Sequence, residues 1–461
     1  MALLLAVRAS IWYNEQRMSH SDIPPTASSR LLAAVLLCAA LAVWGLGWSA
    51  VRIATEGVGV LGVNNAVPWG WDIVLFVFWI GLGHAGTLIS AILLLTGKQW
   101  RSRIAHHAEL MTLCAVCTAA VFPLIHVGRA WMLWQMAPLP VPSGVWPDMA
   151  SALLWDAAAI SSYFILSLLF FYMGIRGEKQ EQRQHRHLWA HSCLLMAGVL
   201  TPLVVMVHSI VGSDFALTLR WQSVIIPPYF VCGALLSGMA AVQLIAIGLH
   251  CRIGIIGKLG QLTAALGGTM GLFYAYELVT EPHLWGNTYA TMILLNVLLP
   301  LGLLSFRKLR HNRLVCILIS IGILYGMWQE RVHIIIERSL LFTGGNYTPS
   351  PVDIALLVGS IGLFLGLFLS IGARLKPAPS APKYVASSSP ISPRAAALCG
   401  SASILVFLII WAICTQWADT AGAAGSSPRG LLWYLPAVIV FCLAGAGVGI
   451  FINYIKRTRQ A

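Results

Sequence analysis

An imidazole, a guanidinium and a carboxylate lie within stretches of this sequence that are otherwise apolar. The segment "FPLIHVGRAW", residues 122–131, places His126 and Arg129 three residues apart, which corresponds to one face of a helix. Asp156 lies roughly two helical turns into the next apolar stretch. Polar groups are costly in hydrocarbon and are usually kept for a function. Histidine titrates near neutral pH, so His126 opposite Asp156 would make a proton-accepting pair.

Other polar residues fall at the ends of apolar stretches. Asp72 begins one such stretch, His208 lies near the end of another, and His84 lies deeper. Each has a structural alternative. Asp72 can be a helix N-terminal charge that the helix dipole favours, and His84 can bond a neighbouring carbonyl. Arg129 can reach the lipid headgroups, as long cations do.

Three further charged residues, Glu330, Arg331 and Glu337, are expected at the membrane interface. The pair Cys114 and Cys117 has a CxxC spacing but lies within an apolar stretch, which favours helix packing. There is no CxxCH motif, so covalent haem is not expected.

The composition is that of a polytopic membrane protein. Of 461 residues, 58% are hydrophobic and 10% are charged, whereas soluble domains carry about 25% charged residues. A span needs about 20 mostly apolar residues, and backbone in lipid must bond internally, so we predict an all-α protein. We predict twelve transmembrane helices, at 30–50, 72–96, 108–134, 150–175, 188–211, 224–250, 258–279, 288–306, 314–332, 353–373, 396–415 and 431–454.

The net charge of +13 reflects membrane topology. With the N-terminus in the cytoplasm, 23 of the 29 Lys and Arg residues fall on the inner side of the twelve helices. This is the positive-inside pattern, and it predicts a multi-pass protein with both termini cytoplasmic. We expect the protein in a bacterial inner membrane. The basic excess therefore does not indicate a nucleic-acid partner.

The predicted organisation contains two related four-helix bundles. Phe78, Gly81 and Gly86 recur as Phe230, Gly233 and Gly238, with Leu236 at the position that corresponds to His84; chance remains an alternative for so few matches. The predicted regions are a cytoplasmic tail (1–29), a flanking helix (30–50), the first bundle (72–211), the second bundle (224–332), a flanking helix (353–373), a Pro/Ser-rich cytoplasmic linker (374–395), and a helical hairpin with a basic tail (396–461). Translation can begin at Met1 or at Met18.

Three segments carry a resemblance to a known family. "WGWDIVLFVFWIGLGHAGTLISAILLL", "FPLIHVGRAW" and "LLWDAAAISSYF" resemble the NrfD/PsrC integral membrane subunits, and look most like the ActC branch from alternative complex III. The resemblance is close over 65–175 and extends to about 373. It does not include the linker or the last hairpin. Members have two four-helix bundles, which agrees with the weak repeat.

The resemblance implies a quinol-binding subunit that has no redox centre of its own. The bound substrate is menaquinol or ubiquinol, with no intrinsic haem, metal or flavin. Electrons leave through an iron–sulfur subunit on the periplasmic side, and further partners are a multihaem cytochrome c and a second NrfD-like subunit. His126 and Asp156 match the quinol pocket of the family. We place Arg129 and Asp72 beside them, and a proton path through His84, His208 and Glu277.

Three rival classes remain. A secondary transporter would suit repeats and intramembrane polar residues, but the polar residues here gather toward one face of the membrane rather than the midplane. A cytochrome b-type subunit needs histidine pairs at matched depth, which His84, His126 and His208 do not offer. A passive anchor for a peripheral oxidoreductase would not require His126 or Asp156.

Overall fold

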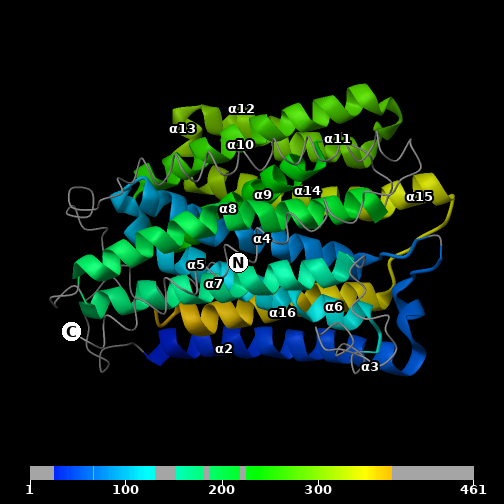
Figure 1. Ribbon diagram of the computed structural model, residues 1–461, viewed down its shortest axis with the longest axis horizontal. Coiled ribbons are helices and arrows are strands. Elements are labelled where there is room, and N and C mark those ends of the chain that lie inside the picture. The colour runs from blue at the N-terminus through cyan, green and yellow to red at the C-terminus, as the bar shows by residue number, and fades with distance from the viewer. Residues whose placement is uncertain (1–24, 66, 130–151, 181–185, 219–224, 376–461) are drawn as a thin grey trace, which may run out of the picture. The chain divides into compact units, whose positions relative to one another are not determined.

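The computed structural model describes residues 25–65, 67–129, 152–180, 186–218 and 225–375. Most of these residues are helical, and none of them forms a strand. The α-helices, labelled as in Figure 1, are α2 (Pro25–Ala42), α3 (Trp48–Glu56), α4 (Trp71–Leu95), α5 (Ala105–Ala119), α6 (Val121–His126), α7 (Ala152–Gln180), α8 (Arg186–Thr218), α9 (Ile226–Gly248), α10 (Ile253–Thr280), α11 (Asn287–Ile293), α12 (Leu299–Ser305), α13 (Arg307–Arg310), α14 (Arg313–Val332), α15 (Arg338–Thr343) and α16 (Pro351–Gly372).

Short 3₁₀ and π-helical turns connect several of these helices. The 3₁₀ turns are Val58–Leu61, Gln99–Arg103 and Pro282–Leu284, and the π-helical turns are Val43–Gly47, Leu294–Leu298 and His333–Glu337. The π turns join α2 to α3, α11 to α12 and α14 to α15 without a break in the helical path. Such π-helical insertions occur frequently at functional sites.

Nine helical segments within the described ranges are long and apolar enough to cross a membrane: 29–56, 71–95, 105–126, 156–176, 189–212, 226–248, 287–305, 313–341 and 351–372. The protein is therefore an all-helical, multi-pass integral membrane protein. The expected span at 258–279 corresponds to α10, a helix of 28 residues that is not among the nine. Six glycines and three threonines lower the mean hydropathy of α10. The expected spans at 396–415 and 431–454, and most of the 374–395 linker, lie outside the described residues.

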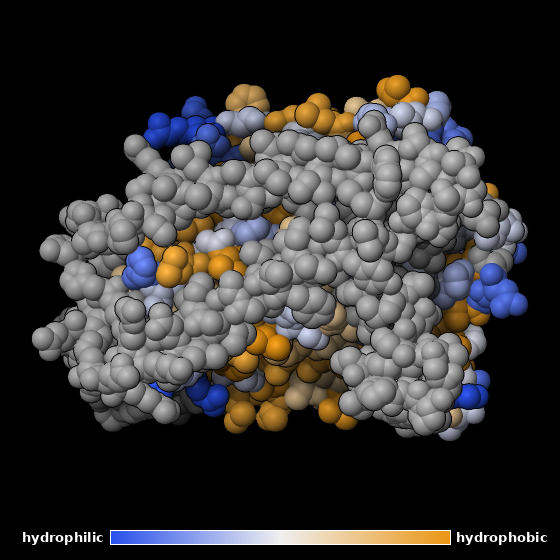
Figure 2. All heavy atoms as spheres, viewed as in Figure 1, coloured by the Kyte–Doolittle hydropathy of each residue, from blue (hydrophilic) through white to orange (hydrophobic). Residues whose placement is uncertain are grey.

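The exposed surface of these helices suits contact with lipid. Leu272 is 72% exposed and Val279 is 80% exposed, both on α10. Where described residues are visible in Figure 2, apolar (orange) residues form several patches, and the most hydrophilic (blue) residues lie mostly toward the left and right ends of the view. An apolar exterior is what hydrocarbon requires, so the polar residues inside the helices need a separate explanation.

The chain divides into two compact units. The first takes in the described residues up to Gly86, from Leu110 to Arg129, and from Cys232 to Leu375. In it α16 lies along α2 (Figure 1), where small residues permit close approach. The second unit takes in Thr87–Glu109 and the described residues from Ala152 to Val231. In this unit α7 lies along α8.

The third expected span is shorter and less regular than its sequence suggested. It was expected at 108–134 as one helix, but α5 ends at Ala119 and α6 runs only from Val121 to His126. Pro123 explains the break, since its ring clashes with the carbonyl four residues earlier, at Ala119, and it has no N–H to donate. The break places Pro123 in the first turn of α6, where proline is tolerated.

The end of α6 is set by Gly128. Its φ of 67° lies in the left-handed region, and its N–H donates to the Ile125 carbonyl at 2.9 Å. A Cβ at this position would also lie 2.6 Å from Val58 Cγ1, so both conformation and space require glycine. This turn makes His126 the last residue of a membrane helix.

Candidate functional site

The structure brings His126 to Asp72, which lies 54 residues earlier in the chain. Nδ1 of His126 is 2.8 Å from Oδ2 of Asp72. Asp72 is in the first turn of α4 and its side chain is fully buried, whereas the His126 side chain is 27% exposed. The helix dipole favours a carboxylate at this position. A buried carboxylate therefore holds an imidazole that is partly exposed.

This arrangement can accept protons. When Nδ1–H of His126 donates to Asp72, the ring presents Nε2 as an acceptor, and the carboxylate stabilises the imidazolium that forms on proton uptake. The other carboxylate oxygen, Asp72 Oδ1, is buried and has no hydrogen-bond partner among the described residues. The pair thus combines an oriented base with a second acceptor atom beside it.

Arg129 does not share a helical face with His126. Because α6 ends at His126 and the chain turns at Gly128, Arg129 follows the helix and is exposed. The prediction that Arg129 and His126 lie on one face of a helix was therefore wrong. Its role in ligand binding stays a prediction.

Asp156 and His208 lie in the second unit. Asp156 is near the start of α7 and is 8% exposed. His208 is on α8, is 1% exposed, and its ring centroid is 6.1 Å from that of Phe230. The pairing of Asp156 with His126, and a proton path through His208, remain predictions.

His84 is buried in the middle of α4, with 1% of its surface exposed. The adjacent Gly83 carbonyl accepts a hydrogen bond from the Thr112 hydroxyl of α5 at 2.6 Å. The expectation that His84 lies deep within a span is confirmed. A role in proton transfer stays a prediction.

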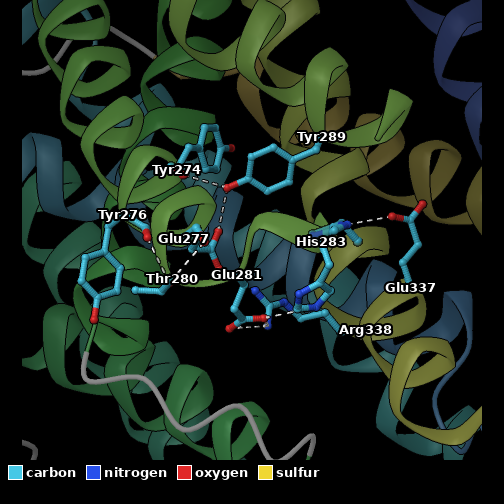
Figure 3. A network of polar contacts seen from close by, with 10 residues as sticks. Tyr274, Tyr276, Glu277, Thr280, Glu281, His283, Tyr289, Glu337 and Arg338 are labelled. Carbon is cyan, nitrogen blue, oxygen red and sulfur yellow. Dashed lines mark hydrogen bonds and ion pairs between the residues drawn. The ribbon is translucent and has the colours of Figure 1, made fainter. Parts of the chain in front are cut away.

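Glu277 belongs to a polar network that Figure 3 shows from close by. Arg338 donates from Nη2 to Glu277 Oε1 at 2.9 Å and from Nη1 to Glu281 at 3.2 Å. The Tyr289 hydroxyl lies 3.2 Å from Glu277 Oε2 and 3.0 Å from the Tyr274 carbonyl. Glu277 and Arg338 are 3% and 1% exposed, while Glu281 is 28% exposed. One guanidinium thus joins a buried carboxylate to one that reaches the surface.

A second buried ion pair, Glu330 with Arg331, lies close by on α14. Arg331 Nη1 donates to Glu330 Oε1 at 2.7 Å, and Tyr274 donates to the other carboxylate oxygen. The expectation that these residues lie at the depth of the membrane interface stays a prediction, but Glu330 is 0% and Arg331 2% exposed, so both are buried within the protein. The reason is Gly233 on α9: a Cβ there would lie 3.0 Å from Arg331 and 3.1 Å from Glu330. The missing side chain makes room for the pair.

His333 and Glu337 form another imidazole–carboxylate pair, in the π-helical turn after α14. His333 Nδ1 lies 2.7 Å from Glu337 Oε2, and Thr288 donates to the other oxygen at 2.9 Å. The His333 side chain is 5% exposed and that of Glu337 36%. The sequence signal for this region is the dense charge pattern "QERVHIIIER", whose opposite charges lie within one apolar run.

The second unit has its own buried ion pair. Arg101 donates from Nη2 to Glu109 Oε1 at 3.0 Å and from Nε to the Ser90 carbonyl at 3.0 Å, and the Ser90 hydroxyl donates to Glu109. These bonds tie the 3₁₀ turn Gln99–Arg103 to the helices on either side of it. Within the described residues of both units, no group of three or more His, Cys, Asp or Glu side chains could hold a metal ion.

Comparison with known proteins defines the family. The family described as "Polysulphide reductase, NrfD" matches residues 59–343, which include both ends of the His126–Asp72 pair and the network around Glu277. The chain belongs to this NrfD family.

Several relatives have been given functional names. The chain is 24% identical over 399 residues to a putative dimethyl sulfoxide reductase membrane subunit of Halobacterium salinarum, a match that covers 74% of this chain and 89% of the relative. It is 25% identical over 215 residues to the Hdr-like menaquinol oxidoreductase integral membrane subunit of Archaeoglobus fulgidus, covering 46% and 49%. It is 23% identical over 260 residues to a selenate reductase subunit of Mesobacillus selenatarsenatis, covering 49% and 58%. For the latter two, the match spans about half of each relative's length.

Proposed function

We propose that this chain is the membrane quinol-binding subunit of a multi-subunit oxidoreductase. The observation that carries the proposal is the His126–Asp72 pair: a fully buried carboxylate 2.8 Å from an imidazole that is partly open, at the ends of two membrane helices. Membership of the NrfD family supports it, as do relatives that are named as membrane subunits of reductases and of a menaquinol oxidoreductase.

The chemistry is the removal of protons from a bound quinol. Oxidation of a quinol to a quinone releases two protons and two electrons. Each hydroxyl needs a proton acceptor within hydrogen-bond reach. In our proposal, His126 Nε2 takes one proton while Asp72 orients the ring, and Asp156 takes the second. The two electrons pass to an iron–sulfur subunit outside this chain. The reverse reaction, quinone reduction, uses the same groups as proton donors.

Proton transfer between the bound quinol and the aqueous phase is also part of the proposal. The residues suggested for a path are His84, His208 and Glu277. All three are buried, with exposures of 1%, 1% and 3%.

The full architecture that we propose has twelve helices, arranged as two four-helix bundles with flanking helices, and both termini in the cytoplasm. This orientation puts the quinol site near the periplasmic face, and the distribution of basic residues supports it. Alkaline phosphatase fused within residues 140–147 should be active, and fused within 178–185 inactive. The opposite pattern would place the site at the cytoplasmic face.

The partners distinguish between kinds of complex. An alternative complex III would contain a periplasmic iron–sulfur subunit, a multihaem cytochrome c and a second NrfD-like subunit. The relatives named above belong to reductases and to a menaquinol oxidoreductase, so the alternative complex III assignment stays a prediction. Affinity purification of the tagged chain from its native membrane, followed by mass spectrometry, identifies which set of partners is present.

The decisive test of the proposed function is quinol binding by the intact complex. Quinone extracted from the purified complex should be present at about one molecule per copy of this chain, and a quinone-site inhibitor should displace it. His126→Gln and Asp72→Asn should lower that occupancy or strongly reduce turnover, while Tyr276→Phe, an exposed substitution on α10, should change neither. Wild-type occupancy and turnover in both site variants would overturn the proposal.

A further inference from the structure

The loop between α15 and α16, residues 344–350, lies against the N-terminal end of α4. The backbone N–H of Trp71, the first residue of α4, donates to the Tyr347 hydroxyl at 3.0 Å. Asn64, in the segment before α4, donates from Nδ2 to the Asn346 carbonyl at 3.3 Å. These contacts connect segments more than 270 residues apart in the sequence. The loop therefore helps to place the first turn of α4.

The Tyr347 hydroxyl connects the N-termini of two membrane helices. It accepts from Trp71 N–H and donates to Asp353 Oδ2 at 3.2 Å. Asp353 is itself held by the N-terminal cap of α16, where Ser350 N–H donates to Asp353 Oδ2 at 2.8 Å. Burial raises the pKa of Tyr347 above its ordinary value, and the carboxylates of Asp353 and Asp72 raise it further. The hydroxyl thus keeps its proton and can fill both roles.

Gly70 shows how near this hydroxyl is to the buried carboxylate. A Cβ at Gly70 would lie 3.1 Å from the Tyr347 hydroxyl oxygen and 3.3 Å from Asp72 Oδ1. The two polar atoms therefore flank the same point beside the start of α4. Asp72 Oδ1 is the carboxylate oxygen that does not contact His126. The Tyr347 hydroxyl thus lies near the Asp72 oxygen that His126 does not contact.

We propose that Tyr347 is a positioning residue for the quinol site. The Tyr347 hydroxyl fixes the first turn of α4 by accepting a hydrogen bond from the Trp71 N–H. Asp72 lies in that turn and orients His126. Loss of the hydroxyl would leave the Trp71 N–H without its acceptor and would release the turn. A misplacement of about 1 Å can lower catalysis by up to about 10²-fold, so a small shift of Asp72 has a measurable effect. This inference rests on the proposed function.

The test is Tyr347→Phe in the intact complex, measured with a water-soluble quinol analogue. The kcat should fall about 5- to 20-fold, which is within the range for misplaced catalytic groups, with little change in KM and normal assembly. In the Asp72→Asn background, Tyr347→Phe should cause no further loss, because residues that act through one another are not additive. Tyr276→Phe is the matched control and should have no effect.

A second variant covers the case in which Tyr347→Phe does not assemble. Gly70→Ala keeps the hydroxyl but adds a methyl group between it and Asp72, and it should give the same fall in kcat at nearly constant KM. An equal loss from Tyr347→Phe in the wild-type and Asp72→Asn backgrounds would overturn the inference. So would wild-type kcat in either Tyr347→Phe or Gly70→Ala. Wild-type quinone occupancy and turnover in both His126→Gln and Asp72→Asn would instead refute the proposed function.

Discussion

Two imidazole–carboxylate pairs in this protein share one type of bond but differ in which partner is buried. In the pair His126–Asp72 the carboxylate is fully buried and the imidazole is 27% exposed. In the pair His333–Glu337 the imidazole is 5% exposed and the carboxylate 36%. Only in the first pair is the imidazole the more exposed partner. Burial therefore separates a proposed proton acceptor from a pair that links helices.

The two pairs also differ in their surroundings, because the pair His333–Glu337 lies beside other buried charged residues. His333 lies beside Tyr289, at 5.4 Å between ring centroids, and Tyr289 also contacts the Glu277–Arg338 pair. The Nε2 atom of His333 is buried and has no hydrogen-bond partner among the described residues. Apart from this atom, the region around His333 contains buried charges that pair with one another, as in a structural network. Substitutions in the two regions should give different phenotypes.

The largest expected effect is on turnover at the first pair. His126→Gln and Asp72→Asn should each lower quinol turnover by about 10²- to 10⁴-fold, because a lost general base has this effect. The double variant should be little worse than either single one. His333→Gln, the matched change, should lower turnover by no more than about threefold in assembled complex, because it does not touch the proposed site. Equal losses at His126 and His333 would remove the distinction between the pairs.

Asp156→Asn tests the other part of the proposed site. It should also reduce turnover by about 10²-fold or more, as expected for a proton acceptor. The complex should assemble normally, as measured by the yield of partner subunits on purification. Near-normal turnover in Asp156→Asn, with a severe defect in Asp72→Asn, would assign the carboxylate role to Asp72 alone.

The next effect is on stability and belongs to the second region. Glu330→Gln or Arg331→Gln should destabilise the complex by about 3–5 kcal/mol, since each leaves a buried charge without the opposite charge of this ion pair. Replacing both residues by Met should be less harmful, because both charges are removed together. The measurement is thermal inactivation of the detergent-solubilised complex. The control is Arg52→Gln, which breaks an exposed pair with Glu56 and should change stability by at most about 1 kcal/mol. Wild-type stability in the single variants would contradict the structural role.

A smaller effect on turnover should distinguish two glycines: Gly128, which follows α6, and Gly344, which follows α15. Gly128 and Gly344 both have positive φ, of 67° and 65°. Alanine should strain either turn by about 1–2 kcal/mol. Only Gly128→Ala also meets a neighbour, Val58, and so should displace the end of α6 and lower turnover about tenfold. Gly344→Ala has open space around its Cβ and should leave turnover unchanged. Equal turnover in both variants would show that the end of α6 tolerates movement.

The smallest effect is expected at Arg129. Because this side chain is exposed and lies beyond the end of α6, Arg129→Ala should change stability by less than about 0.5 kcal/mol and turnover by about threefold or less. A loss as large as that of His126→Gln would restore Arg129 to the proposed site.

Local sequence patterns predicted most of the helices but not where they end. The apolar runs located all nine membrane-spanning segments of the described residues, and also the helix α10. They did not show that the third span breaks at Ala120 and stops at His126, although Pro123 and Gly128 are visible in the sequence. An apolar run reports what lipid accepts, whereas a helix end depends on backbone bonds and on contacts such as that of Gly128 with Val58.

The amino-acid sequence was enough to assign the class of protein: an all-helical, multi-pass membrane protein of the NrfD family, with His126 and Asp72 among its candidate residues. The fold was needed to show that His126 bonds to Asp72, that Tyr347 contacts the start of α4, and that Glu330 and Arg331 are buried. The physical reason is that periodicity fixes which residues share a face of one helix. The rotation and depth of each helix against its neighbours are set by close packing, which here depends on small residues such as Gly233.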